Sequence, residues 1–293
     1  MISVLIFRVL KVARLLWRPF YRASRPGVRL FNQSRIRRTP IDILVAEQSA
    51  NFAALNLDFR KAQKKVVDLL GEQVDLKSHQ SQHYELVVAF SELFEPRRIL
   101  EIGTADGSFA AFLSLVFPAA KIDTLDLPEA DPRFFNAVNL EVSTQSKEVL
   151  SNNFAESVFK RKQNLGSSSN IRFVANNSLL LSRFESSKYD LIWVDGDHTY
   201  PIVACDIANA VRLVADDGLI LCDDVFLSRG QKGKWGAQES AQTLKCYESA
   251  GVLKNSFVLK SIRPEKNYSK LVKKHISVSK LLVTGQDILL FEN

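Results

Sequence analysis

The sequence is poor in sulfur, and this shortage excludes one class of protein. It has three cysteines in 293 residues, an odd number without the paired spacing of a metal site. A scaffold held by disulfides is therefore not expected, and the plain prediction is a set of reduced thiols in a cytoplasmic protein. Cys205 and Cys222 fall in apolar segments, so they are expected to be buried.

Acidic residues are missing from one end of the chain. Residues 1–40, here called the N-terminal arm, contain ten lysines and arginines and no aspartate or glutamate. Residues 41–293 hold 29 basic residues against 32 acidic ones, so the arm carries the whole net charge of +7. The body of the protein is mildly acidic, and this charge balance offers no case for a nucleic-acid partner.

The arm also lacks an apolar run close to the roughly 20 residues that a membrane span requires. Its bases recur at steps of three and four residues with apolar residues between them, which predicts an amphipathic helix. Such a helix over residues 1–22 would lie on an anionic membrane surface, at the inner face of a membrane. Two alternatives are a cleaved targeting segment and a helix that docks on a partner protein. The bases are Arg8, Lys11, Arg14, Arg18 and Arg22.

Residues 41–95 show helical patterns and are expected to form an N-terminal helical cap, followed by one domain over residues 96–293. In that domain short apolar runs alternate with helical segments, including a long polar insert at 132–165. The pattern predicts an α/β fold, a Rossmann-like, doubly wound and mostly parallel seven-stranded sheet with an antiparallel edge strand. Residues 263–280 are basic and are expected to be rich in turns. The expected strands are Arg98–Gly103, Lys121–Leu127, Ile171–Ala175, Tyr189–Asp195, Gly218–Asp223, Ser256–Ile262 and Asp287–Phe291.

The loop after the first expected strand lacks the Gly-x-Gly-x-x-Gly pattern of dinucleotide sites, which disfavours a nicotinamide-linked oxidoreductase. It has Gly103 and Gly107 where the chain must turn and let a ligand approach. Asp126 ends the second strand, where a carboxylate can bind ribose hydroxyls. Asn177 and Ser178 follow the third strand and suit a purine edge. Each has an alternative role, as a turn acid or a helix cap, but together they predict a nucleoside ligand.

On these residues, the segment from about 80 to 293 resembles the class I S-adenosylmethionine-dependent methyltransferases, although Ala105 replaces the commoner glycine. The resemblance implies S-adenosyl-L-methionine as cofactor. It assigns the cofactor to Glu101, Gly103, Thr104, Ala105, Gly107, Ser108, Asp126, Asn177, Ser178 and Asp195.

The fourth and fifth expected strands both end in acid, at Asp195 and Asp197 and at Asp223 and Asp224. Clustered carboxylates repel one another unless a cation or a proton lies among them. The pattern resembles the metal-dependent O-methyltransferases of catechol and sugar hydroxyls. That resemblance implies Mg²⁺ on Asp195, Asp223 and Asp224, and Asp197 as general base. The acceptor would be a small molecule or a glycan.

Other interpretations of the acids stay open. A methyltransferase without a metal would use one of the paired acids for the cofactor or for a helix cap, and His198 is a rival base. A membrane-tethered protein that binds the cofactor without catalysis is a third possibility. The glycine-rich loop at 227–236 is either a lid over the site or an ordinary surface loop. The oligomeric state is left open by the sequence.

Deleting residues 1–40 is expected to release the protein from anionic liposomes, because the arm holds all of the excess positive charge. Co-sedimentation with liposomes of anionic and of neutral lipids measures this. Affinity for S-adenosylhomocysteine should stay unchanged, and undiminished liposome binding by the truncated protein would contradict the anchor.

Overall fold

The computed structural model describes residues 41–71, 83–139, 145–166, 168–227, 238–264 and 271–282. The N-terminal arm, most of the expected lid and the expected strand Asp287–Phe291 lie outside these residues. None of the helices within them is both long and apolar enough to cross a membrane.

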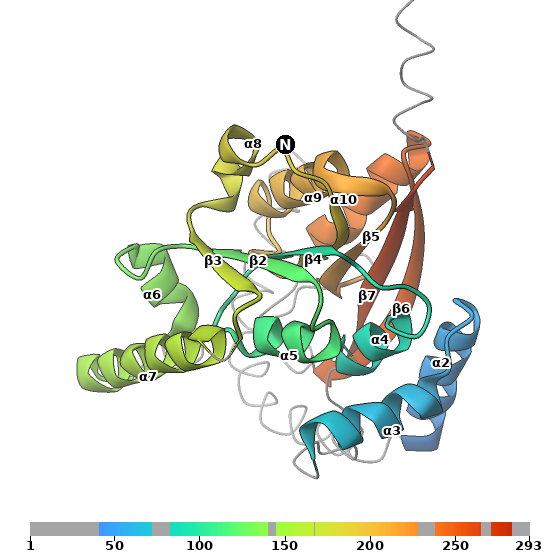
Figure 1. Cartoon of the computed structure of the whole chain (residues 1–293), viewed down its shortest axis with the longest axis horizontal. Helices are drawn as coiled ribbons and strands as arrows, with labels where there is room; N and C mark the ends of the chain where they lie inside the picture. Colours follow the sequence, from blue (N-terminus) through green and yellow to red (C-terminus); the bar gives the residue numbers. More distant parts are fainter. Residues whose placement is uncertain are drawn as a thin grey trace, which may run out of the picture.

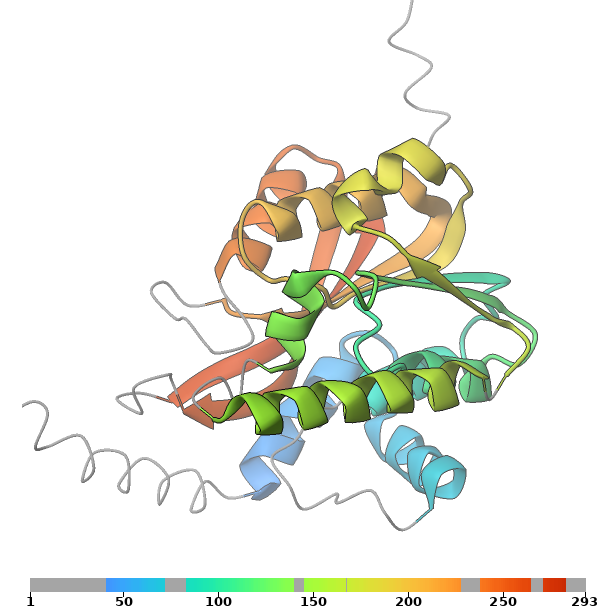
Figure 2. The ribbon, with the colours of Figure 1, turned by 90° about the vertical axis from the view of Figure 1, so that its left-hand side faces the viewer.

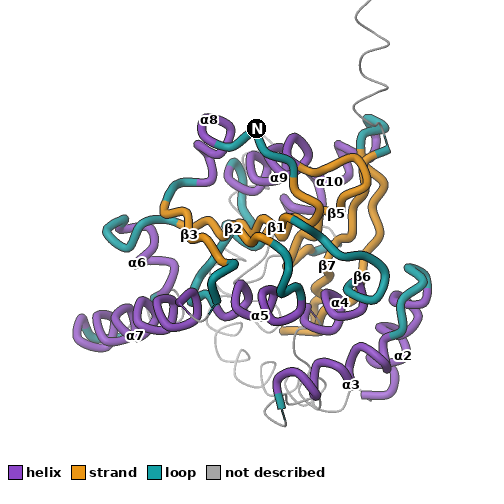
Figure 3. Tube along the Cα trace, in the orientation of Figure 1, coloured by secondary structure: helices purple, strands orange, loops and turns teal. Residues whose placement is uncertain are grey.

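Seven strands form one sheet in the order β3-β2-β1-β4-β5-β7-β6, which confirms the predicted class of fold (Figure 3). The first five strands run parallel, whereas β7 is antiparallel to both β5 and β6. The strands are β1 (Arg98–Ile102), β2 (Lys121–Asp126), β3 (Ile171–Ala175), β4 (Tyr189–Val194), β5 (Val214–Val225), β6 (Leu253–Pro264) and β7 (Leu271–Leu281).

Helices cover both faces of the sheet (Figure 1). Helices α2 to α5 share one apolar cluster with the first face, and α8 to α10 share another with the second. The cap predicted at 41–95 therefore shares its core with the sheet. The helices are α2 (Ile41–Ala53), α3 (Phe59–Leu70), α4 (His83–Phe90), α5 (Ser108–Val116), α6 (Pro132–Val138), α7 (Lys147–Gly166), α8 (Leu181–Phe184), α9 (Ile202–Leu213) and α10 (Gln238–Ser249), with a 3₁₀ turn η1 (Ser178–Leu180).

The structure makes one expectation more precise and corrects another. The insert at 132–165 contains two helices, of which α7 runs beneath α6 and along α5 (Figure 2). The segment at 263–280 contains most of β7 and is not simply turn-rich. Its strand character is hidden because Ser277 and Ser279 are fully buried polar residues in a stretch that also carries exposed lysine. Cys222 is buried as expected, Cys205 is half-buried, and all three cysteines are free.

The register of the sheet aligns the strand ends that carry the predicted site. Ile102 pairs with both Leu125 and Val194, and Val194 pairs in turn with Cys222. The next residue of each strand lies beyond these pairs, at one edge of the sheet. Between β1 and β4 the order of the strands reverses, and such a switch point is where open α/β sheets bind their ligands.

Glu85 on α4 is buried, and burial raises its pKa to about 7. The folded protein therefore holds a proton on Glu85 at a pH where the unfolded chain has lost it, and stability falls as the pH rises from about 4.5 to 7. We expect Glu85→Gln to remove this pH dependence of stability. The free energy of unfolding of Glu85→Gln, relative to that of the wild type, should therefore show a gain of about 2–3 kcal/mol between pH 4.5 and 8. Urea denaturation across this range measures the gain.

Glu95→Gln is the matched control, since Glu95 is an exposed residue of the same part of the chain. It should keep the slope of the wild type. The prediction is contradicted if the difference in free energy of unfolding between the wild type and Glu85→Gln is the same at pH 8 as at pH 4.5.

Candidate functional site

The turn after β1 brings two strand ends into backbone contact. Gly103 has φ of +105°, and a Cβ atom on it would collide with the carbonyl oxygen of Asp195 and lie 2.8 Å from the nitrogen of Gly196. Asp195 N also donates to Ile102 O at 2.8 Å. Only glycine permits this approach, so the predicted importance of Gly103 has a steric cause.

The rest of the loop is fastened to β2. Ala105 adopts a left-handed conformation, with φ of +48°, and its N–H donates to Asp126 Oδ2 at 2.9 Å. Leu127 N donates to Asp126 Oδ1 at 2.7 Å. Gly107, with φ of +76°, precedes α5. Asp126 therefore has a structural role in holding the loop, in addition to its predicted role toward a ribose.

Arg161 on α7 connects the insert to this loop, and sequence reasoning missed it. Its side chain is 1% exposed, and it donates to Ala105 O at 2.6 Å and to Asp126 Oδ2 at 2.8 Å. Its guanidinium lies over the ring of Phe134, 3.8 Å from the centroid. Burial raises the pKa of Asp126, and the charge of Arg161 counteracts this. One cation thus ties both sides of the predicted cofactor loop together.

A buried polar chain supports the loop from below. Thr124 Oγ1 donates to Glu101 Oε2, and Thr104 Oγ1 lies 2.6 Å from Thr124 Oγ1. Burial raises the pKa of Glu101 well above its usual range. Glu101 and Thr104 are nearly inaccessible, so in this structure these two predicted cofactor residues lie beneath the loop. Ser108, the first residue of α5, donates to Asp106 Oδ1 through both its N–H and its Oγ.

The polar groups of the loop after β3 form hydrogen bonds within the protein. Asn177 caps η1, because its Oδ1 accepts from Leu179 N at 3.0 Å. Ser178 O accepts from Asn209 Nδ2 on α9. Nearby, Asp206 on α9 is 1% exposed, and burial raises its pKa to about 6. The capping role that the sequence left open for Asn177 is observed, and its predicted contact with a purine stays a prediction.

The end of β4 presents Asp195 and Asp197 differently. Asp195 is partly exposed, and its Oδ1 lies 3.3 Å from His198 Nε2. Asp197 is exposed, and its Oδ1 accepts from Thr199 N at 2.8 Å and from Thr199 Oγ1 at 2.6 Å. Both of these bonds fall on one carboxylate oxygen, so they leave Oδ2 to act on another group.

The end of β5 carries a cluster of four buried charges. Lys260 Nζ on β6 donates to Asp223 Oδ2 and, at 2.8 Å, to Asp224 Oδ1. Lys274 Nζ on β7 donates to Asp224 Oδ2. Burial raises the pKa of Asp223. Burial also acts to raise the pKa of Asp224, but the charges of Lys260 and Lys274 outweigh this effect and lower that pKa to about 2. Sequence reasoning missed both lysines.

His83, the first residue of helix α4, feels the charges of this cluster. The pKa of His83 is lowered to about 3 by burial and by the charge of Lys260, so His83 is neutral. Its ring lies 5.2 Å from Phe109 and 6.2 Å from Trp193, between centroids. The lysines and acids therefore lie next to an aromatic wall at the carboxyl end of β4.

In the observed arrangement, these acids do not form the predicted Mg²⁺ site. A hard cation needs carboxylate oxygens that face an open position, but ammonium groups occupy Asp223 Oδ2 and both oxygens of Asp224. Asp195 points instead to His198. Within the described residues, no group of three or more acidic, histidine or cysteine side chains could hold a metal ion.

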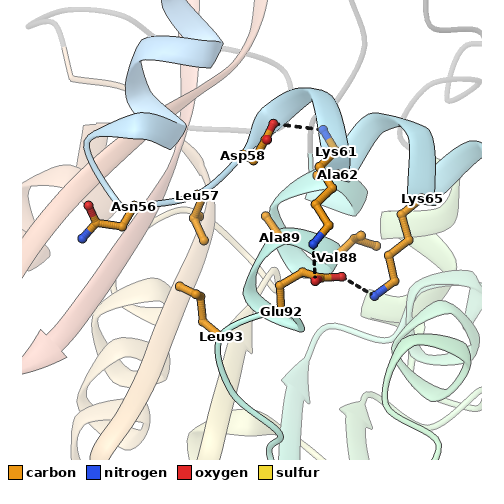
Figure 4. Close-up of a pocket in the computed structure, with 10 residues that line it drawn as sticks. All are labelled: Asn56, Leu57, Asp58, Lys61, Ala62, Lys65, Val88, Ala89, Glu92 and Leu93. Atoms are coloured by element: carbon orange, nitrogen blue, oxygen red, sulfur yellow. Dashed lines mark hydrogen bonds and ion pairs between the residues drawn. The ribbon is translucent and has the colours of Figure 1, made fainter.

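A pocket of about 270 Å³ lies elsewhere, between α3 and α4 (Figure 4). Lys61 and Lys65 both reach Glu92 there, at 2.7 and 2.8 Å. The pocket adjoins Leu93, close to the segment that enters the amino end of β1. It lies away from the carboxyl ends of the strands and is not part of the candidate site.

Comparison with known proteins agrees with the geometry. The family model described as a methyltransferase domain matches residues 100–225, which run from β1 through β5. A search of curated proteins finds no match.

Several solved structures are similar in outline. The O-methyltransferase TomG of Streptomyces achromogenes, in complex with S-adenosylmethionine, is 18% identical, with 82% of this chain and 98% of that one covered and a TM-score of 0.47. A methyltransferase of Podospora anserina is 15% identical, with 75% and 87% covered and a TM-score of 0.43. An O-methyltransferase of Bacillus cereus is 14% identical, with 76% and 90% covered and a TM-score of 0.43.

The sheet reverses its strand order at β1/β4 and has a glycine loop after β1 and an acid at the end of β2, and open α/β sheets bind nucleoside ligands at such a place. The family model identifies the segment from β1 to β5 as similar to a methyltransferase domain.

Arg161→Met is expected to weaken binding of S-adenosylhomocysteine about tenfold, because it leaves the Ala105 carbonyl and the Asp126 carboxylate without their shared cation. Isothermal titration calorimetry measures the affinity. Arg172→Met is the control, since Arg172 pairs with Asp123 in the middle of β2, away from the loop. Equal affinities in both variants would contradict the role of Arg161.

Proposed function

We propose that the protein transfers a methyl group from S-adenosylmethionine to a hydroxyl group of a small-molecule or sugar-containing acceptor. The observation that carries the proposal is the register of the sheet, which aligns Gly103 and Asp126 with Asp195 and Asp223 at one edge. A nucleoside bound over β1 and β2 would then have its reactive end beside β4 and β5.

S-adenosylmethionine, when bound, supplies an electrophilic methyl group, and the bond from the acceptor oxygen to carbon forms as the carbon–sulfur bond breaks with its electron pair on sulfur. Gly103 and Ala105 border the cofactor through their backbone, and Asp126 accepts from the ribose hydroxyls. The chain's main task is to hold the acceptor oxygen in line with the methyl group, since positioning supplies much of the acceleration of a two-substrate reaction.

Asp197 is the proposed general base, because it is exposed next to Asp195 and keeps Oδ2 for the hydroxyl proton. Its bonds to Thr199 fix the direction of the carboxylate. Mg²⁺ assistance, which the family resemblance implies, receives no support from the ion pairs of Asp223 and Asp224, and no step is routed through a metal.

The proposal is tested by incubating the full chain with S-adenosylmethionine labelled in its methyl group and a panel of polyols, catechols and glycosides. Transfer of label to an acceptor oxygen, located by mass spectrometry, is the expected result. Label that appears only on nitrogen or carbon acceptors would contradict O-methylation.

Asp197→Asn separates the chemical role from the structural one, because asparagine can still accept both bonds from Thr199 but cannot take a proton. We expect kcat to fall by about 10²–10⁴-fold, with an unchanged melting temperature and unchanged affinity for S-adenosylhomocysteine. A variant that retains the kcat of the wild type would exclude Asp197 as the base.

A further inference from the structure

The acid pair at the end of β5 is already neutralised by the protein itself. Lys260 and Lys274 are 12% and 11% exposed, and the side chains of Asp223 and Asp224 are 5% and 8% exposed. Burying one charge of such a group without its partners is strongly destabilising. These contacts are therefore a built cluster and differ from surface ion pairs, which exchange freely with solvent.

Irregularities in two strands create the cluster. Neighbouring residues of a regular strand point to opposite faces, and Asp223 and Asp224 would then diverge. A register shift between Cys222 and Val225, with φ of +51° at Asp224, brings both carboxylates to one cation. A second shift, between Leu259 and Ser261, lies at Lys260 itself. Bulges of this kind re-aim side chains next to functional sites.

The position of the lysines coincides with the place that the family resemblance gives to a divalent cation. Two ammonium groups bind three of the four oxygens of Asp223 and Asp224. An ammonium group has three donors, and the two acids account for two of those on Lys260. The bonds to Asp223 and Asp224 therefore leave one donor of Lys260 for another acceptor.

We propose that Lys260 and Lys274 replace the divalent cation in this chain. In the first half of the proposal, the two lysines prevent a metal ion from binding to the acid pair. In the second half, Lys260 Nζ donates to the acceptor oxygen and stabilises the negative charge that develops on it during methyl transfer. The second half rests on the proposed function, whereas the first half does not. A fixed donor of this kind acts by preorganised electrostatics and needs no change of coordination.

The metal half is tested with Mn²⁺ alone, whose free form gives an electron paramagnetic resonance signal that is lost on binding. The full-length wild type is expected to leave the signal of millimolar Mn²⁺ unchanged. Lys260→Met combined with Lys274→Met exposes four carboxylate oxygens and should bind Mn²⁺, and adding Asp223→Asn and Asp224→Asn should abolish that binding.

Two results would overturn the metal half. One is binding of Mn²⁺ by the wild type that Asp223→Asn removes. The other is a folded double-lysine variant, judged by circular dichroism, that still binds no Mn²⁺. If that variant does not fold, Lys260→Gln combined with Lys274→Gln takes its place, and the measurement on the wild type decides in either case.

The catalytic half is tested by methyl transfer. Activity of the wild type should survive EDTA, and Lys260→Met should lower kcat on the order of 100-fold with unchanged affinity for S-adenosylhomocysteine. Lys273→Met is the matched control, since Lys273 is half-exposed on the same strand as Lys274 and pairs with Glu47, and its activity should equal that of the wild type. Loss of activity in EDTA that Mg²⁺ restores would overturn this half.

Failure of the metal half is distinguishable from failure of the proposed function. If no acceptor is methylated by any form of the protein, the proposed function fails, yet the Mn²⁺ measurement still decides whether the lysines exclude a cation.

Discussion

The contact between Gly103 and Asp195 is the constraint on which the site depends. The two residues follow β1 and β4 at the point where the order of the strands reverses, and no side chain fits at Gly103. Because the backbones touch here, the loop of β1 and the acids of β4 are held at a fixed separation. The chain can then add Asp126 on one side and Asp223 on the other without further adjustment, since both follow from the register of parallel strands.

Three elements outside this constraint complete the site, and each acts through a buried cation. Arg161 reaches in from α7 and ties Ala105 to Asp126. Lys260 and Lys274 reach in from the antiparallel strands and hold Asp223 and Asp224. The central strands thus provide the acids, and the peripheral elements provide the charges that let those acids be buried. The methyltransferase domain matched at 100–225 contains only one of these three cations.

The central strands could be predicted because buried parallel strands are continuous apolar runs that end in polar residues. The antiparallel strand β7 could not, since its buried face includes Ser277 and Ser279. Arg161 stands between Lys160 and Lys162 in a polar helix, and nothing local distinguishes a buried base from its exposed neighbours. Lys260 did leave a signal, because it is the one base in the mainly apolar segment from Phe257 to Ile262 of β6. Its meaning depends on Asp223 and Asp224, which are more than 30 residues away.

The ion pairs of Lys260 also have a consequence for the order in which the chain becomes functional. Synthesis delivers Asp223 and Asp224 before either lysine, and β7 must be inserted between β5 and β6 for Lys260 to reach them. A nascent chain that ends shortly after β5 therefore holds two adjacent carboxylates that have no internal cation from β6 or β7. The cluster is complete only once both of the last two described strands are present.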